Sequence, residues 1–130
     1  MQKNLLEALA IDAETTSVIA VVGGGGKTSL IFRLMEEFVA GGKKVIVTTT
    51  THMAYEPDRP FAEDGDTDKI CDQLKNFGYT VAAGLNRSKG KIGCLPEEKL
   101  PKIKRLCDVL LIEADGAKRL PLKVPGAVSY

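Results

Sequence analysis

Residues 18–29 read VIAVVGGGGKTS, an apolar run that breaks into four glycines followed by Lys-Thr-Ser. Glycines let a backbone turn tightly and present a cup of N–H donors, and the start of a following helix adds partial positive charge for an anion. A lysine at this point reaches terminal phosphates, and a threonine hydroxyl next to it holds Mg²⁺. The stretch therefore predicts a buried strand, a phosphate-binding loop and the start of a helix. The predicted nucleotide contacts are Gly23, Gly24, Gly25, Gly26, Lys27, Thr28 and Ser29.

The glycine loop departs from the common spacing G-x-x-x-x-G-K-[ST], because Val21 stands where the first glycine is expected. The shorter form G-x-x-G-K-T fits from Gly23 onward. A dinucleotide-binding G-x-G-x-x-G motif does not fit, since it needs a glycine where Thr28 or Ser29 stands. A purely structural glycine turn is the alternative, but Lys-Thr at the start of a helix after a strand favours phosphate binding.

The rest of the first half has the pattern of a strand–helix–strand unit. One apolar stripe runs along the predicted helix as far as the glycines at 41–42, and residues 44–50 suit a strand buried on both faces. The apolar run 109–112 predicts another buried parallel strand. We therefore expect an α/β, P-loop-containing nucleotide-binding fold with a mostly parallel sheet flanked by helices. The helical stripe consists of Leu30, Ile31, Leu34, Phe38 and Val39.

The middle of the chain predicts three further elements. Residues 56–66 hold two prolines, a glycine and five acids, which indicates an exposed loop. Asp66 is then expected to cap a helix that ends at Gly78 and buries Ile70, Leu74 and Phe77. Residues 79–95 predict a β-hairpin around a five-residue loop.

Acidic residues follow the second apolar strand, in the sequence Glu113-Ala114-Asp115-Gly116. Ligands of open parallel sheets bind beyond the carboxyl ends of the strands, so this segment should meet the glycine loop and the threonines at 48–51. Mg²⁺ needs hard oxygen ligands, which Thr28 with Glu113 or Asp115 can supply. In the alternative, Glu113 pairs with a lysine and Asp115 forms a turn with Gly116.

His52 is the single histidine and follows a threonine-rich strand end that should border the phosphates. It could act as a metal ligand, a proton carrier or a hydrogen-bonding loop residue. A basic segment made of Lys118, Arg119 and Lys123 follows the acids. These three cations are either solvated surface charges or contacts for an anionic substrate.

Whole-chain properties limit the classes of partner. With 130 residues, 44% of them hydrophobic, the chain can form one domain that buries a core. A net charge of +1 gives no electrostatic case for binding nucleic acid or a membrane surface. The start of the chain lacks the features of a secretory signal, so we expect a cytoplasmic protein. The three cysteines lack metal or disulfide spacing and are expected to be buried, reduced thiols.

Two resemblances add to these predictions. The glycine loop and the Glu-Ala-Asp after a strand resemble, locally, the ATP-dependent Mur ligases, whose glutamate at that place binds Mg²⁺. Over most of its length the chain resembles the YqeC-type family, through GGGGKTS, VIVTTTTHM and DVLLIEADGAKRLPLKVP. That second resemblance implies a cytoplasmic nucleotide-binding accessory protein that helps mature a selenium-dependent molybdenum hydroxylase, its client.

The YqeC-type resemblance also concerns the end of the chain. Family members continue past the KVP block, so we expect this 130-residue chain to be incomplete and to lack a C-terminal part. A fragment of this kind could form a homodimer that covers an exposed sheet edge.

Three functions are compatible with these residues. The first is a Mg²⁺-dependent NTPase in which Lys27, Glu113, Asp115 and His52 are the candidate catalytic residues. The second is a kinase or Mur-like ligase that acts on a small anionic substrate, and the third is a non-catalytic nucleotide sensor. The nucleotide is ATP or GTP; the absence of an N-K-x-D guanine signature from these residues mildly favours ATP.

Overall fold

The computed structural model describes residues 6, 9, 11–12, 17–22, 26–114 and 126–129, the last segment by its backbone. Three helices and eight strands are defined there, and the sheet order is β3-β6-β5-β2-β7-β1-β8, with β4 also pairing with β5. The helices are α2 (Lys27–Ala40), α3 (Thr67–Phe77) and α4 (Lys99–Lys104). The strands are β1 (Val18–Val22), β2 (Val45–Thr49), β3 (His52–Ala54), β4 (Phe61–Glu63), β5 (Tyr79–Asn86), β6 (Lys91–Gly93), β7 (Val109–Glu113) and β8 (Gly126–Ser129).

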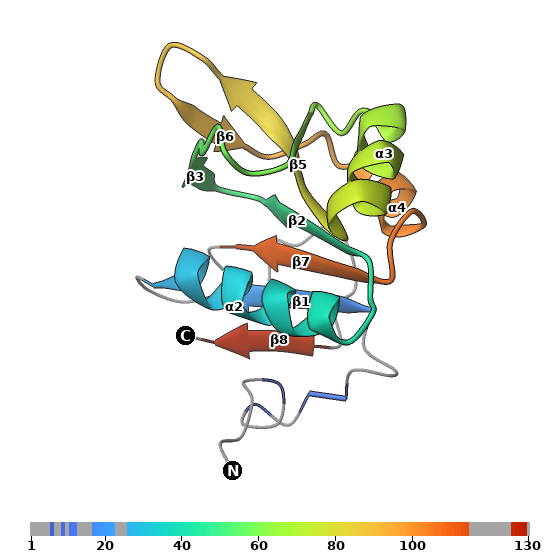
Figure 1. The fold of residues 1–130 in the computed structure, drawn as a ribbon. Helices are drawn as coiled ribbons and strands as arrows, with labels where there is room; N and C mark the ends of the chain where they lie inside the picture. The colour runs from blue at the N-terminus through green and yellow to red at the C-terminus, as the bar shows by residue number, and fades with distance from the viewer. Residues whose placement is uncertain are drawn as a thin grey trace.

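The sheet is mostly parallel and has helices on both faces, as the sequence predicts (Figure 1). β5, β2, β7, β1 and β8 run parallel in that order, and β4 lies parallel to β5. β6 runs antiparallel to both of its neighbours, β5 and β3. Helix α2 lies on one face of the sheet, and α3 and α4 lie on the other.

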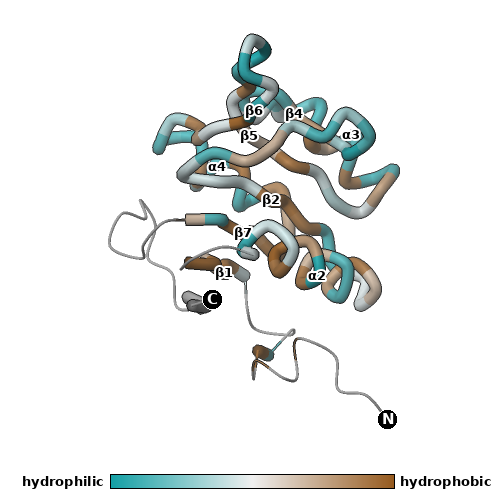
Figure 2. Tube along the Cα trace, turned by 90° about the vertical axis from the view of Figure 1, so that its left-hand side faces the viewer, coloured by the Kyte–Doolittle hydropathy of each residue, from teal (hydrophilic) through white to brown (hydrophobic). Residues whose placement is uncertain are grey.

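The core divides into two layers because side chains alternate along each buried strand. Ile19 and Leu111 pack toward α2, whereas Ala20 and Ile112, one position further along their strands, pack toward α3 and α4. Both faces of β1, β2 and β7 are therefore apolar, and Figure 2 shows these strands and the inner side of α2 as the hydrophobic part of the molecule. Near-continuous Val, Ile and Leu runs are typical of such doubly covered parallel strands.

Helix α2 confirms the predicted apolar stripe. Leu30, Ile31, Leu34 and Phe38 are buried together with Met35, and Val39 packs against the same core. The helix ends where predicted, and the Gly41 N–H donates to the carbonyls of Glu37 and Phe38 at 3.1 Å. With 14 residues, α2 is too short to cross a bilayer, and no helix in the described part of the chain meets that requirement.

Helix α3 confirms the predicted ends but not the predicted buried face. The Asp66 carboxylate accepts from the Lys69 N–H at 3.2 Å, and Gly78 ends the helix with a φ of 82°. Phe77, however, is 57% exposed, and Gln73 is buried instead. The Gln73 amide donates to the Phe61 carbonyl at 3.1 Å and accepts from the Thr80 hydroxyl, which offsets the cost of burying it.

The predicted exposed loop at residues 56–66 is wrong for its second half. Strand β4 forms there, pairs in parallel with β5 and buries Ala62 completely. The partner strand begins 16 residues after β4 ends, so the pairing is a tertiary contact that local composition does not reveal. Asp64 and Gly65, with φ values of 57° and 70°, then turn the chain into α3.

The predicted hairpin at residues 79–95 is confirmed by the antiparallel pairing of β5 with β6. Four residues connect the strands instead of five, because Asn86 itself pairs with Lys91. The Asn86 side-chain oxygen accepts from the Ser88 hydroxyl at 2.8 Å and from the Lys89 N–H at 3.2 Å, and so holds the turn. Figure 1 shows the hairpin projecting beyond the helical layers.

The expectation of three buried thiols is wrong. Cys71 and Cys94 are exposed, and only Cys107 is partly buried. Cys71 lies on the outer side of α3, and Cys94 directly follows β6. The pKa of the Cys107 thiol is raised to about 12, mainly by burial and to a smaller extent by Asp108, while neighbouring backbone N–H groups and Lys104 oppose the rise.

We predict that the three cysteines react at different rates with iodoacetamide at pH 8. Thiolate is the reacting form, so Cys71 and Cys94 should be alkylated rapidly, and Cys107 should react at least about 100-fold more slowly. Peptide mass spectrometry over a time course measures each rate, and the urea-unfolded chain serves as the control in which all three should react alike. Equal rates in the folded chain would contradict the partly buried environment of Cys107.

Candidate functional site

The carboxyl ends of β1, β7 and β2 meet at one edge of the sheet. In the strand register Glu113 lies opposite Val21 on one side and Thr49 on the other. Backbone hydrogen bonds continue past the strand ends, from Ala114 N to the Val21 carbonyl at 3.0 Å and from Thr50 N to the Glu113 carbonyl at 2.9 Å. The register therefore places Glu113 beside the carboxyl end of β1.

Helix α2 begins at this edge without a side-chain cap. Its N-cap residue is Gly26, whose φ of 88° lies in the left-handed region that glycine tolerates. No described side chain caps it, and its first turn holds no acid, whereas α3 has Asp66 as its cap and Asp68 in its first turn. No described side chain therefore satisfies the first N–H groups of α2, and the helix dipole favours a negative group at this end.

Two side chains of the first turn of α2 reach the end of β7. The Thr28 hydroxyl donates to Oε2 of Glu113 at 3.1 Å, and Nζ of Lys27 donates to the Ala114 carbonyl at 3.2 Å. Glu113 is only 5% exposed. An ammonium, a hydroxyl and a carboxylate from segments 85 or more residues apart are therefore gathered at one point of the sheet edge.

Thr49 connects β2 to the same point. Its hydroxyl donates to the Glu113 carbonyl at 3.1 Å, accepts from the Thr51 N–H at 3.0 Å and lies 3.3 Å from the Thr51 hydroxyl. The residue types alone do not distinguish Thr49 from the other threonines at 48–51. The alternation of side chains along the strand does distinguish it, because Val45, Val47 and residue 49 share the face that carries α2.

Thr48 differs from Thr49 in its face of the strand and in its hydrogen bonding. It is fully buried on the other face of β2, and its hydroxyl has no hydrogen-bond partner among the described residues. A buried hydroxyl without a partner lowers stability, so Thr48 and Thr49 form a natural pair for comparison.

The remaining predicted residues fall in three groups. Ser29 lies on the exposed side of the first turn of α2. His52 is exposed at the start of β3, opposite Gly93 of β6, and its side chain makes no hydrogen bond to a described residue. The third group lies outside the part of the chain that the structure describes, so the positions of its members stay predictions. Its members are Gly23, Gly24, Gly25, Asp115, Lys118, Arg119 and Lys123.

The fold and this edge define an α/β protein with a helix-flanked, mostly parallel sheet and a Gly-Lys-Thr helix start at its carboxyl end. The chain matches the YqeC protein family over residues 19–128, which is most of its length, and it belongs to that family. The match includes β1, α2 and β7, and therefore every described side chain of the Lys27–Thr28–Glu113 cluster. Comparison with curated proteins and with solved structures gives no match.

We predict that valine at the two neighbouring threonines of β2 has different effects on the free energy of unfolding. Thr49→Val removes the bond to the Glu113 carbonyl and the acceptor for the Thr51 N–H, and should lower the free energy of unfolding by about 1–3 kcal/mol. Thr48→Val removes a hydroxyl without a described partner and should leave stability unchanged or raise it slightly. Urea denaturation of both variants measures the difference. A larger loss for Thr48→Val than for Thr49→Val would refute this account of the strand end.

Proposed function

We propose that the chain binds a nucleoside triphosphate with Mg²⁺ at the carboxyl edge of β1 and β7. The observation that carries the proposal is the Thr28–Glu113 contact of 3.1 Å next to Lys27, at a helix start without a described side-chain cap. Backbone N–H groups, an ammonium and a hydroxyl are the groups that hold phosphates at such helix starts. Gly23 to Gly26 would supply further N–H donors as a P-loop.

The donor set at this edge fits a divalent cation. Thr28 and Glu113 offer a hydroxyl and a carboxylate oxygen 3.1 Å apart, and both are the hard oxygen ligands that Mg²⁺ prefers. Asp115 is a further candidate ligand from the sequence. When bound, Mg²⁺ would neutralise charge on the β- and γ-phosphates and orient them.

The chain's own residues would act mainly by position and charge. Lys27, now on the Ala114 carbonyl, would exchange that neutral acceptor for a phosphate oxygen, which is the stronger, charge-assisted interaction. Thr28 would turn its hydroxyl oxygen from the Glu113 carboxylate toward the metal, while the buried Glu113 keeps its position in β7. Phosphoryl transfer depends largely on such positioning, so few residues suffice for NTPase activity.

The proposed cellular role is nucleotide-dependent help in the maturation of a selenium-dependent molybdenum hydroxylase. Membership of the YqeC protein family supports an accessory role, and the selenium and molybdenum link comes from the resemblance described above. Nucleotide turnover would then control when the accessory protein acts on its client in the cytoplasm.

We predict that the chain binds ATP or GTP in the presence of Mg²⁺ and that Lys27→Ala weakens this binding about 10- to 100-fold, because one charge-assisted contact is lost. Isothermal titration calorimetry measures both affinities. Lys75→Ala, which removes an exposed lysine of α3, is the matched control and should bind as the wild type does. A folded chain that binds no nucleotide, or a control as weak as Lys27→Ala, would overturn the proposal.

A second prediction concerns the metal. Glu113→Gln keeps the size of the side chain but removes its charge, so Mg²⁺ should enhance nucleotide affinity at least about 10-fold less than in the wild type. Titrations with and without Mg²⁺ give the enhancement for each protein, and Glu97→Gln at an exposed position is the control. An unchanged enhancement in Glu113→Gln would remove Glu113 from the metal site.

A further inference from the structure

A cavity lies over the β3–β6–β5 part of the sheet, outside the proposed nucleotide site at the carboxyl edge of β1 and β7. Its volume is about 300 Å³, which is at the lower end of the range for small-molecule sites. None of its lining residues belongs to the Lys27–Thr28–Glu113 cluster. The lining residues are His52, Gly84, Leu85, Asn86, Lys89, Lys91, Ile92 and Gly93.

The strand register explains why the sheet is hollow here. Gly84, Gly93 and His52 form one row across β5, β6 and β3, and the next row on the same face is Asn86, Lys91 and Ala54. Two adjacent glycines leave the backbone uncovered in the first row. A Cβ on Gly93 would point into the hollow, 3.6 Å from Nδ1 of His52. The side chains that border the uncovered backbone are those of His52, Asn86 and Lys91.

The charged residues that line this cavity are two lysines. Lys89 and Lys91 line it and form no ion pair with any described residue, while the third cation of the turn, Arg87, pairs with Glu63 at 2.6 Å. Among the described residues no acid lines the cavity, but the Asp64 carboxylate lies at its border, 3.9 Å from the position of a Cβ on Gly84. Both ammonium groups would be attracted to an anion that enters the cavity.

The polar groups of the cavity are available for a ligand. Asn86 uses its side-chain oxygen within the turn, so its amide nitrogen remains as a donor, and the His52 ring makes no hydrogen bond to a described residue. Together with Lys89 and Lys91 these groups form a donor set that suits an oxyanion.

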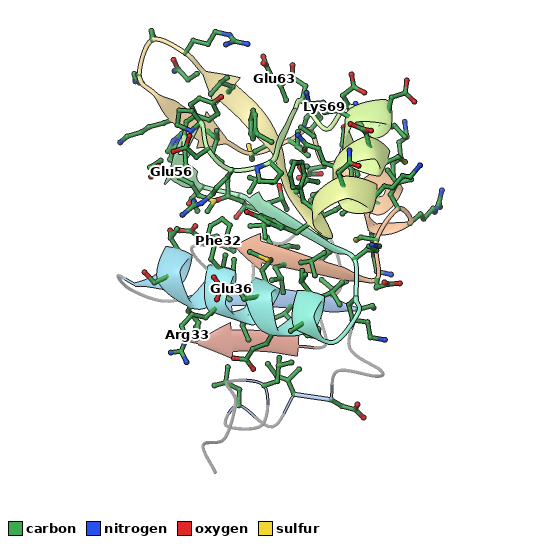
Figure 3. All side chains as sticks on the ribbon, viewed as in Figure 1. Phe32, Arg33, Glu36, Glu56, Glu63 and Lys69 are labelled. Atoms are coloured by element: carbon green, nitrogen blue, oxygen red, sulfur yellow. The ribbon has the colours of Figure 1, made fainter. Side chains whose placement is uncertain are left out.

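A larger cavity, of about 420 Å³, differs in this respect. It lies between β4 and α3, where Figure 3 shows Glu63 and Lys69. Three of its polar side chains already have partners: Glu63 binds Arg87, Asp66 caps α3, and Gln73 bonds to β4 and β5. Its charges are also of both signs, so it has no comparable demand for an anion.

A short chain of contacts connects the cavity at His52 to the edge of the sheet at which the nucleotide is proposed to bind. The carbonyl of Thr51 is 3.8 Å from a Cβ built on Gly93, the Thr51 hydroxyl is 3.3 Å from that of Thr49, and Thr49 donates to the Glu113 carbonyl. Only Thr50 and Thr51 separate β2 from β3. A ligand in the cavity would therefore lie next to the edge at which the nucleotide is proposed to bind.

We propose that this cavity binds a small-molecule oxyanion, a phosphate or carboxylate group held by Lys89, Lys91 and His52, with the body of the ligand over the Gly84–Gly93 row. Binding of the oxyanion in this cavity does not require the nucleotide. The further interpretation, that the cavity holds a second, anionic substrate, rests on the proposed function. This interpretation favours a nucleotide-dependent transferase or ligase over a simple NTPase.

The single histidine provides a local probe of this site. We would follow the C2–H proton resonance of the His52 imidazole in the full chain at constant pH while adding sodium phosphate, sodium acetate or, as the salt control, sodium chloride. We expect a saturable shift with phosphate, with acetate or with both, beyond the drift that chloride causes. Saturation by phosphate alone assigns a phosphate group, and saturation by acetate assigns a carboxylate. A drift identical in all three salts would overturn the proposal.

Three variants test the named residues. Lys89→Ala/Lys91→Ala should weaken the response at least about 10-fold, whereas Lys75→Ala/Lys102→Ala, which removes the same charge from exposed helix positions, should retain it. Gly93→Val keeps all charges but fills the hollow, and should also lose the response. An equal loss in both lysine pairs, or full retention in Gly93→Val, would overturn the site.

The same variants separate this inference from the proposed function. Lys27→Ala should weaken nucleotide binding and keep the His52 response, whereas Lys89→Ala/Lys91→Ala should weaken the His52 response and keep nucleotide binding. A wild-type chain that binds no nucleotide but keeps the saturable response would overturn the proposed function and leave the oxyanion site standing.

Discussion

The parallel pairing of β7 between β1 and β2 is the constraint on which the rest of the structure depends. It places Glu113 opposite both Val21 and Thr49, so that three segments distant in sequence end at one edge. It also buries both faces of β7, which requires helices on each side of the sheet. A one-residue slip would turn Glu113 to the opposite face and break its contact with Thr28.

The two helix starts show how this edge differs from the rest of the molecule. Helix α3 begins with an aspartate cap and a second acid, which satisfy its first N–H groups and its dipole. Helix α2 begins with glycine and lysine, residues that contribute little to its own stability. Its start is supported from outside instead, by contacts of Lys27 and Thr28 with the end of β7. The side-chain cap that stabilises the start of α3 thus has no counterpart among the described residues at the start of α2.

The errors of the sequence analysis have a common physical origin. Phe77 has the spacing of a buried residue, yet it lies at the last turn of α3, while Gln73 is buried because β4 and β5 complete its hydrogen bonds. The acid-rich segment before α3 contains β4 because β5 offers an edge to it. Composition describes what a residue prefers on average, whereas the burial of Gln73 and the formation of β4 depend on partners in other elements.

The sequence by itself determined the alternation of strands and helices, the apolar stripe of α2, the cap of α3 and the Gly-Lys-Thr start that singles out one edge, because each depends on residues within one or two turns. Only the tertiary structure decided which carboxylate meets Thr28, that Thr49 and not Thr48 joins this cluster, and that His52 faces a glycine-lined hollow with two lysines. Those outcomes follow from strand order and register, which are set by the burial of the whole sheet between its two helical layers.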